Sequence, residues 1–238
     1  DPGIGKSTLL LHVLDKVGGL YVSGEESAEQ VKLRAKRLGI SGENITILAE
    51  TNDESIIQIL SSLDQPNSLV IVDSIQTLSS DDLEGLAGSV GQLRHCAELL
   101  TGVAKAKAIS LIIIGHVTKE GTIAGPKVLE HMVDTVLFLE GERFANARIL
   151  RTLKNRFGPV EEVGIFEMTE NGMREVLNPS EISLTSAIEQ TSGSCITVIM
   201  EGYRPLLFEV QALTVRTAFG YPKRTTSGYP VNRLQVLL

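Results

Sequence analysis

Apolar and polar residues alternate along the first half of the chain with two different periods. Short apolar runs, which are typical of strands buried on both faces, occur near 20–22, 45–49, 68–73 and 109–114. Apolar residues at helical spacing lie between them, directly after Ser7 and near 27–38, 53–63 and 86–106. Strands that alternate with helices predict an α/β fold with a parallel sheet and right-handed crossovers.

The pattern changes after residue 130. The segments DTVLFLE, RILRTLK and VGIFEMT are short strands separated by turns, which predicts an antiparallel extension of the same sheet. The turn LNPSE, at 177–181, is the predicted domain boundary. Beyond it, GSCITVIMEG, RPLLFEVQALTV and GYPVNRLQVLL form a β-rich segment that is too short to enclose a core of its own. The basic loop from Tyr221 to Gly228 is typical of a solvated turn.

Composition is that of an ordinary soluble globular protein, with 42% hydrophobic and 21% charged residues among 238. No apolar stretch is long enough to span a bilayer. The net charge of −7 argues against a protein covered in positive potential, so a nucleic-acid site would have to be a locally cationic channel. Aromatic residues make up 4% and Trp is absent, so few side chains are available to stack on nucleic-acid bases. Cys96 and Cys195 are isolated, which fits a reducing compartment and gives no metal-ligand spacing.

Both ends of the chain indicate a fragment. The chain begins inside a motif, at DPGIGKST, and it stops inside the apolar run NRLQVLL. We therefore expect it to belong to a longer protein.

The opening segment DPGIGKST matches the phosphate-loop pattern G-x-x-x-x-G-K-[ST] except for the first glycine, which would precede Asp1. Backbone N–H groups of such a loop cradle phosphates, and the loop leads into a helix N-terminus, which favours an anion. We expect Lys6 to hold the terminal phosphates and Ser7 to ligate Mg²⁺. The alternative is a glycine-rich turn before a helix. The residues predicted to bind the nucleotide here are Pro2, Gly3, Ile4, Gly5, Lys6, Ser7 and Thr8.

Two acidic residues follow buried strands. Asp73 ends the run LVIVD and suits the residue that holds the Mg²⁺ shell, although apolar strands often end in Asp without this role. Glu25 follows the strand at 20–22 and can polarise the water that attacks the γ-phosphate. In the alternative interpretation it is a first-turn acid of the helix that begins near Ser27, because SAEQ is a capping-box pattern. The two interpretations are compatible.

His116 follows the strand at 109–114, at the sheet edge where ligands bind in open α/β folds. A polar residue there can sense the γ-phosphate and bind the nucleotide. A lone histidine is more often a packing or hydrogen-bonding residue.

Six segments cover nearly the whole chain in order: DPGIGKST, YVSGEESAEQ, VDSIQT, GHVTKEGTIAGPKVLEHMVDTVLFLEG, LKNRFG and EGYRPLLFEVQAL. Together they resemble the family of bacterial DNA repair proteins RadA (also called Sms), for which K-N-R-F-G is characteristic. The resemblance implies a RecA-like P-loop NTPase core at 1–180. It also implies the start of an α+β domain like that of the Lon protease (ribosomal protein S5-like) at 181–238, to which we assign no protease residues. A four-Cys zinc finger is implied upstream, so Zn²⁺ is expected only outside this chain.

The resemblance also implies a function. Members of the family form hexameric rings that use ATP and Mg²⁺, move on single-stranded DNA and extend recombination branches together with the RecA recombinase. A bacterial cytoplasmic location at the nucleoid follows. Two alternatives stay open: a nucleotide switch like the circadian-clock ATPases, and a DNA-annealing scaffold whose nucleotide only sets assembly.

In RecA-like rings the nucleotide lies between subunits, and the neighbouring subunit supplies cations. Lys154 and Arg156, in KNRFG, are two residues apart and so share one face of an extended segment, and Gly158 then lets the backbone turn away. We expect both to act on the neighbour's nucleotide. The alternative is a pair of solvated cations on an edge strand.

The loop from Thr118 to His131 falls where RecA-like proteins place a DNA-binding loop. It carries Lys119 and Lys127, which we expect to contact phosphates of single-stranded DNA. The alternative is an ordinary surface loop.

Overall fold

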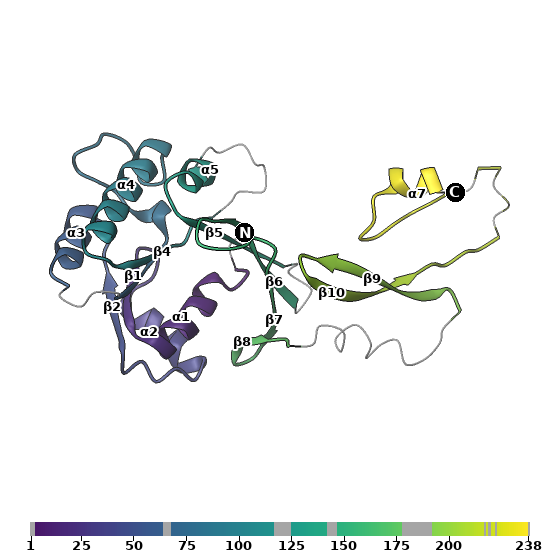
Figure 1. The fold of residues 1–238 in the computed structure, drawn as a ribbon, viewed down its shortest axis with the longest axis horizontal. Coiled ribbons are helices and arrows are strands. Elements are labelled where there is room, and N and C mark those ends of the chain that lie inside the picture. The colour runs from purple at the N-terminus through teal and green to yellow at the C-terminus, as the bar shows by residue number, and fades with distance from the viewer. Residues whose placement is uncertain are drawn as a thin grey trace. The chain divides into compact units, whose positions relative to one another are not determined.

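The computed structural model describes residues 3–63, 68–116, 125–141, 147–177, 192–216, 218, 220–221 and 223–237. The chain divides into two compact units, Asp1–Pro179 with Met200–Leu206, and Ser180–Ile199 with Leu207–Leu238 (Figure 1). Each unit is described by itself. The Lon-like character of the second domain stays a prediction.

A parallel sheet forms the centre of the first unit. Its strand order is β2-β1-β3-β4, and every neighbouring pair is parallel, as predicted. The bounds are β1 Gly19–Ser23, β2 Ile45–Ala49, β3 Leu69–Asp73 and β4 Ser110–Ile113. Because β1 and β3 lie inside the sheet, their residues are buried on both faces, which explains the continuous apolar runs in the sequence.

Helices cover both faces of this sheet. Tyr21 and Ile71 pack with α1 (Lys6–Val17) and α2 (Ala28–Arg37), whereas Val22 and Val72 pack with α3 (Asp53–Ser61) and α4 (Val90–Ala106). The short 3₁₀ helix η1 (Ile75–Thr77) follows β3. The sheet is thereby covered on both faces, and the segments that follow each strand lie at its carboxyl edge.

Four antiparallel strands follow, in the order β5-β6-β7-β8. They are β5 Thr135–Glu140, β6 Ala147–Asn155, β7 Val163–Thr169 and β8 Gly172–Glu175, and they come after the helix α5, Gly125–Glu130. The expectation that they extend the parallel sheet was wrong, because among the described residues they hydrogen bond in a sheet of their own. Consecutive antiparallel strands satisfy their backbone groups through local turns, so they need no pairing with β4.

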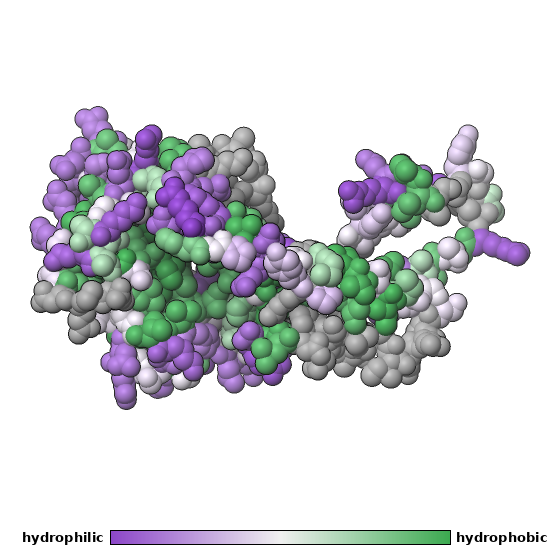
Figure 2. Space-filling model, in the orientation of Figure 1, coloured by the Kyte–Doolittle hydropathy of each residue, from purple (hydrophilic) through white to green (hydrophobic). Residues whose placement is uncertain are grey.

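A two-stranded sheet follows, β9 Ser194–Glu201 and β10 Arg204–Gln211. The second unit contains this sheet except for Met200–Leu206, which belongs to the first unit, and it also contains the helix α7, Val231–Leu237. Apolar side chains on this hairpin are exposed, among them Ile196, Val198 and Val210 (Figure 2). Within the described ranges, no helix of the chain has both the length and the apolar character that crossing a membrane requires.

Candidate nucleotide-binding site

Segments far apart in the sequence meet at the carboxyl edge of the parallel sheet. The Lys6 ammonium donates to the carbonyl oxygen of Gly115 at 2.8 Å, and it lies 2.8 Å from Nδ1 of His116. The Nε2 atom of the same imidazole lies 3.3 Å from Oε1 of Glu25. The structure therefore brings the phosphate loop together with the residues that follow β1 and β4. Their roles stay predictions.

The phosphate loop has a backbone that suits an anion. Gly5 has a φ of 104°, in the left-handed region that glycine adopts without strain, and it begins α1 with no side-chain cap. By contrast α2, α3 and α4 begin with the side-chain caps Ser27, Asn52 and Ser89. The first-turn N–H groups of α1 are thus left for an anion, and no acidic residue lies in that turn to repel it.

Of the other predicted loop residues, Gly3 has a φ of 78° and Ile4 is buried. Thr8 is half-buried in the first turn of α1. Pro2 lies outside the described residues.

The contact between Lys6 and His116 determines which ring nitrogen of His116 carries the proton. An ammonium group only donates, so Nδ1 of His116 accepts and the neutral ring carries its proton on Nε2, facing Glu25. Burial lowers the pKa of Lys6, while the charges of Asp73 and Glu25 act in the opposite direction. Burial also lowers the pKa of His116, and the charge of Lys6 adds to this effect. A neutral His116 is therefore the favoured form.

Glu25 and its neighbour Glu26 are directed to different partners. Glu25 accepts a hydrogen bond from the Ser74 hydroxyl at 2.8 Å and its side chain is about half exposed, whereas Glu26 pairs with Arg34. Gly24 allows this arrangement, because a Cβ at this position would lie 1.9 Å from the hydroxyl oxygen of Thr77. The loop after β1 is thus pressed against η1, which places Glu25 beside His116.

Ser27 forms the capping box that the sequence predicts. Its side chain accepts from the backbone N–H of Gln30, whose own side chain accepts from the N–H of Ser27. The cap is complete without Glu25, so the capping interpretation does not compete with a role of Glu25 at the nucleotide.

The oxygen atoms expected to bind Mg²⁺ lie close together. The buried hydroxyl of Tyr21 donates to Oδ2 of Asp73, and the nearby side chain of Ser7 acts to lower the pKa of Tyr21. Ser7 and Asp73 therefore both lie beside the same phenol. A hydroxyl and a carboxylate fit Mg²⁺, which binds few protein oxygens and keeps several waters. Among the described residues, no group of three or more His, Cys, Asp or Glu side chains forms a metal cluster.

Sequence reasoning missed several residues of this region. Ser74 binds Glu25, Gln76 donates to the carbonyl of His116 at 3.2 Å, and Arg148 donates from β6 to the carbonyl of Ile4 at 3.1 Å. Tyr21 had a usable signal, since a phenol inside a buried strand needs a partner for its hydroxyl. The others have no local pattern, because their partners come from distant segments.

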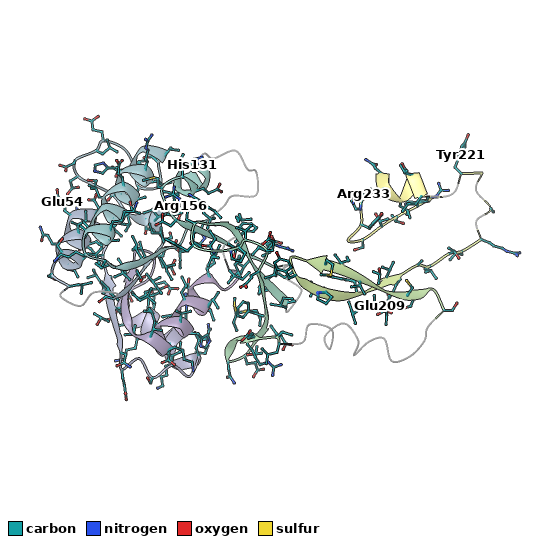
Figure 3. The ribbon with its side chains drawn as sticks, viewed as in Figure 1. Glu54, His131, Arg156, Glu209, Tyr221 and Arg233 are labelled. Carbon is teal, nitrogen blue, oxygen red and sulfur yellow. The ribbon has the colours of Figure 1, made fainter. Side chains whose placement is uncertain are left out.

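Lys154 and Arg156 have partners within the same chain. Lys154 donates to the carbonyl oxygens of Glu130 and Val133 at 2.7 and 2.6 Å, at the end of α5. Arg156 lies 3.0 Å from Asp134, beside the turn that also holds His131 (Figure 3). Both side chains are directed at the segment between α5 and β5. Lys154 lies near the end of β6, where the strand pairs with β5 but its described pairing with β7 has ended at Arg151, and Arg156 follows the strand. The alternative of two cations at a sheet edge therefore stays open.

The predicted DNA-binding loop is partly helical. Gly125–Glu130 forms α5, where we expected a loop, because Pro126 is tolerated in a first helical turn and good helix formers follow it. Lys127 belongs to α5, and its side chain lies outside the described part of the structure, as does the whole of Lys119. Their contacts to DNA stay a prediction.

The fold and this site define a class of protein. A phosphate loop that leads into a helix, beside the carboxyl edge of a parallel sheet, is the arrangement of a RecA-like P-loop NTPase. The RadB recombinase has a similar fold, with a TM-score of 0.54 at 22% identity over 73% of this chain and 86% of its own. A DnaB-like replicative helicase has a TM-score of 0.57 at 15% identity over 72% of this chain and 56% of its own. At these identities the likeness concerns the fold alone.

Over its whole length the chain is similar to proteins named DNA repair protein RadA. Identity is 53% to the protein of Bacillus subtilis, 54% to that of Streptococcus pneumoniae and 49% to that of Halalkalibacterium halodurans, each over 100% of this chain. The relatives confirm the resemblance that the motifs indicate. The chain spans 53%, 57% and 53% of their lengths, respectively. No family model matches the chain.

Proposed function

We propose that this chain is the ATP-hydrolysing core of a DNA-dependent motor that acts on single-stranded DNA and drives branch migration during recombination and repair. One observation supports the proposal above the others. The phosphate-loop Lys6 meets Glu25 and His116 at one sheet edge, in a chain about half identical to DNA repair proteins RadA. A cytoplasmic, nucleoid-associated location and cooperation with the RecA recombinase belong to the same proposal.

Each residue at the edge has a part in hydrolysis. Lys6 binds the terminal phosphates, and Glu25 orients the attacking water, its carboxylate already held by Ser74. Ser7 and Asp73 hold Mg²⁺, which when bound neutralises charge on the phosphate oxygens. His116 senses the γ-phosphate, because a phosphate that attracts Lys6 removes a hydrogen bond from its ring.

The assembled form is proposed to be a hexameric ring with the nucleotide between subunits. Lys154 and Arg156 then act in trans on the neighbour's triphosphate. The Arg156–Asp134 pair is largely exposed, and such pairs contribute only about 0–1 kcal/mol, so releasing Arg156 costs little. Lys154 is bound more firmly, by two carbonyls, and its release requires a shift at the end of α5.

The decisive experiment measures ATP turnover by the full-length protein with and without single-stranded DNA, and then with added RecA recombinase. We expect DNA to raise the rate, and a Lys6→Ala variant to abolish both basal and stimulated turnover. Turnover that DNA leaves unchanged would contradict a motor and would favour the nucleotide switch. Branch extension that persists in Lys6→Ala would favour the scaffold.

The DNA-binding assignment gives a first testable prediction. Replacing both Lys119 and Lys127 by Ala should weaken binding of single-stranded DNA and reduce the slope of log affinity against log salt by about 1–2, since two phosphate contacts are lost. Titration of labelled oligonucleotide at several salt concentrations measures both quantities.

The matched control replaces Lys105 and Lys107, which are exposed in the last turn and at the C-cap of α4 and precede β4, at the opposite edge of the sheet. It removes the same charge and should leave the salt slope unchanged. An unaltered slope in the Lys119 and Lys127 variant would remove this segment from the DNA site.

A further inference from the structure

A buried arginine outside the predicted site contacts the phosphate loop. Arg148 lies near the start of β6 and is 6% exposed, although arginine is rarely buried without a specific partner. Its Nε donates to the carbonyl oxygen of Ile4 at 3.1 Å, across 144 positions of sequence. The contact joins the antiparallel sheet to the loop that is expected to bind phosphate.

The geometry of a peptide unit gives this contact a consequence. In a planar trans peptide the C=O of one residue and the N–H of the next point in opposite directions. A guanidinium that holds the carbonyl of Ile4 on one side therefore directs the N–H of Gly5 to the other side. That N–H belongs to the set that cradles phosphates in such loops.

The other side of Gly5 is fixed independently. Its carbonyl accepts from the N–H of Leu9 at 2.9 Å, as part of the first turn of α1. Because Gly5 has no Cβ to restrict its φ, the preceding peptide is weakly restrained by the residue itself, and the hydrogen bond from Arg148 adds a restraint on that peptide.

The antiparallel sheet supports the same residue at a second point. A Cβ at Gly5 would lie 2.2 Å from the methyl carbon of Met173 and 3.4 Å from the sulfur of Met168. These methionines are directly opposite each other on β8 and β7. One polar and two apolar side chains of this sheet thus press on two adjacent loop residues.

We propose that Arg148 is a positioning residue of the phosphate site: it holds the Ile4 carbonyl so that the Gly5 N–H faces the phosphates, and its buried charge favours their negative charge. The proposal rests on the proposed nucleotide-binding function and adds to it a residue from a different sheet. Because its action is on phosphate, its effect grows with the number of phosphates in the ligand.

The test compares ATP, ADP and AMP by competition against a fluorescent ATP analogue, with the full-length protein. Arg148→Met keeps the length of the side chain and removes both the donor and the charge. We expect ATP affinity to fall on the order of 10–100-fold, as for loss of a hydrogen bond to a charged group, ADP affinity to fall less and AMP affinity to stay unchanged. Arg148→Lys keeps the charge and one donor, and should recover part of the loss.

Two further variants make the test specific. Gly141→Ala leaves Arg148 in the sequence but introduces a Cβ 2.3 Å from its Cδ and 2.8 Å from its Nε. It should therefore displace the guanidinium and, like Arg148→Met, lower the affinity for ATP more than the affinity for ADP or AMP. Arg151→Met removes a cation from the same strand whose partner is Glu140, at 3.1 Å, and should change none of the three affinities.

The outcomes separate the two proposals. If the unaltered protein fails to bind ATP, or Lys6→Ala binds it equally well, the proposed function is wrong. If the unaltered protein binds ATP through Lys6 while the Arg148 variants and Gly141→Ala match it, the positioning role is wrong. Equal losses for ATP and AMP would also overturn that role, because they indicate a general structural defect. Gly141→Ala and Arg148→Lys decide the question if Arg148→Met does not fold.

Discussion

Tyr21 shows how one buried hydroxyl connects the core of the sheet to the proposed Mg²⁺ site. Its ring packs among apolar residues against α1 and α2, and its hydroxyl donates to Asp73. Burial and the charge of Asp73 both raise the pKa of Tyr21, so the phenol stays a donor throughout the physiological range. The hydrogen bond thereby orients Asp73 at a nearly inaccessible strand end.

A Tyr21→Phe variant tests this connection. It leaves a buried carboxylate oxygen without its donor, so the free energy of unfolding should fall by about 1–3 kcal/mol. The Mg²⁺ concentration that supports half-maximal ATP turnover should rise, because Asp73 loses its orientation. Urea unfolding and Mg²⁺ titration measure the two effects.

The matched control is Tyr221→Phe, which removes a hydroxyl from a side chain that is 92% exposed (Figure 3). Its effect on stability should lie within about 0.5 kcal/mol. Equal stabilities of the two variants would show that the Tyr21 hydroxyl contributes nothing.

The two cysteines predict a contrast in reactivity. Cys96 is fully buried on α4, and burial followed by the charge of Asp53 raises the pKa of its thiol to about 12, whereas Cys195 is exposed. Since the thiolate is the reactive form, alkylation of Cys96 in the folded protein at pH 8 should be roughly a hundredfold slower, or more, than alkylation of Cys195.

The raised pKa also fixes the sign of the pH effect. A thiol whose pKa is higher in the folded chain contributes stability below its ordinary pKa of 9.0 and loses that contribution as the pH rises toward about 12. Iodoacetamide labelling followed by peptide mapping checks the reactivity, with Cys195→Ser as the control that removes the fast reaction. Labelling of both cysteines at one rate would contradict the burial of Cys96.

At the scale of elements, two nearby residues in the turn between β1 and α2 have different contacts. Ser27 completes a helix cap, whereas Glu25 lies beside Ser74 and His116. We therefore expect Ser27→Ala to lower the free energy of unfolding by about 1 kcal/mol and to leave turnover per folded molecule unchanged.

Glu25→Gln should show the reverse behaviour. Its side chain is about half exposed, so stability should change little, while turnover should fall on the order of 10²–10⁴-fold if Glu25 orients the attacking water. Urea unfolding and ATP turnover of both variants provide the comparison. Loss of turnover in Ser27→Ala would instead indicate that the whole turn, and not one carboxylate, is required.

Periodicity predicts the elements of the parallel sheet because its strands are buried on both faces and its helices on one. β2 has the predicted bounds, and β1 and β3 differ from them by one residue. The long helix begins at Val90 instead of 86, because Ser89 caps it and Gln92 binds the backbone of Ser80 and Leu83, which holds the preceding segment in a loop. Such a constraint arises between segments and leaves no local pattern.

The antiparallel strands show the limit of this reasoning. β7 has the predicted bounds, whereas β8 has four residues, GMRE, too few for a period of two to be visible. The pattern of a strand also says nothing of which sheet it joins. The contact of Arg148 with Ile4 depends on where the antiparallel sheet packs. The phosphate-loop motif could therefore be recognised from the sequence, whereas the arginine that contacts it could not.

At the scale of the whole molecule, β6 carries residues of two proposed functions. Arg148, near its start, holds the chain's own phosphate loop, and Lys154, near its end, belongs to the motif proposed to act on a neighbour. Between them β5 and β6 shift register at Val136/Leu137, an irregularity of the kind that redirects side chains near functional sites. A change in the phosphate loop therefore has a short covalent route to the proposed interface.

The trans role of this motif can be tested by mixing inactive subunits. An Arg156→Ala subunit keeps its phosphate loop, and a Lys6→Ala subunit keeps its Arg156, so an interface between them contains one intact copy of each. In equal mixtures about one quarter of the head-to-tail interfaces of a ring should be of this kind, and turnover should recover in proportion. Recovery should be far above either variant alone, because an arginine supplied in trans contributes about 10³–10⁵ in rate.

As the control, Lys6→Ala is mixed with a chain that carries both substitutions, which forms no intact interface and should stay inactive. If no mixing ratio restores or suppresses turnover, Arg156 acts within its own subunit, where Asp134 already binds it, and the shared pocket is wrong.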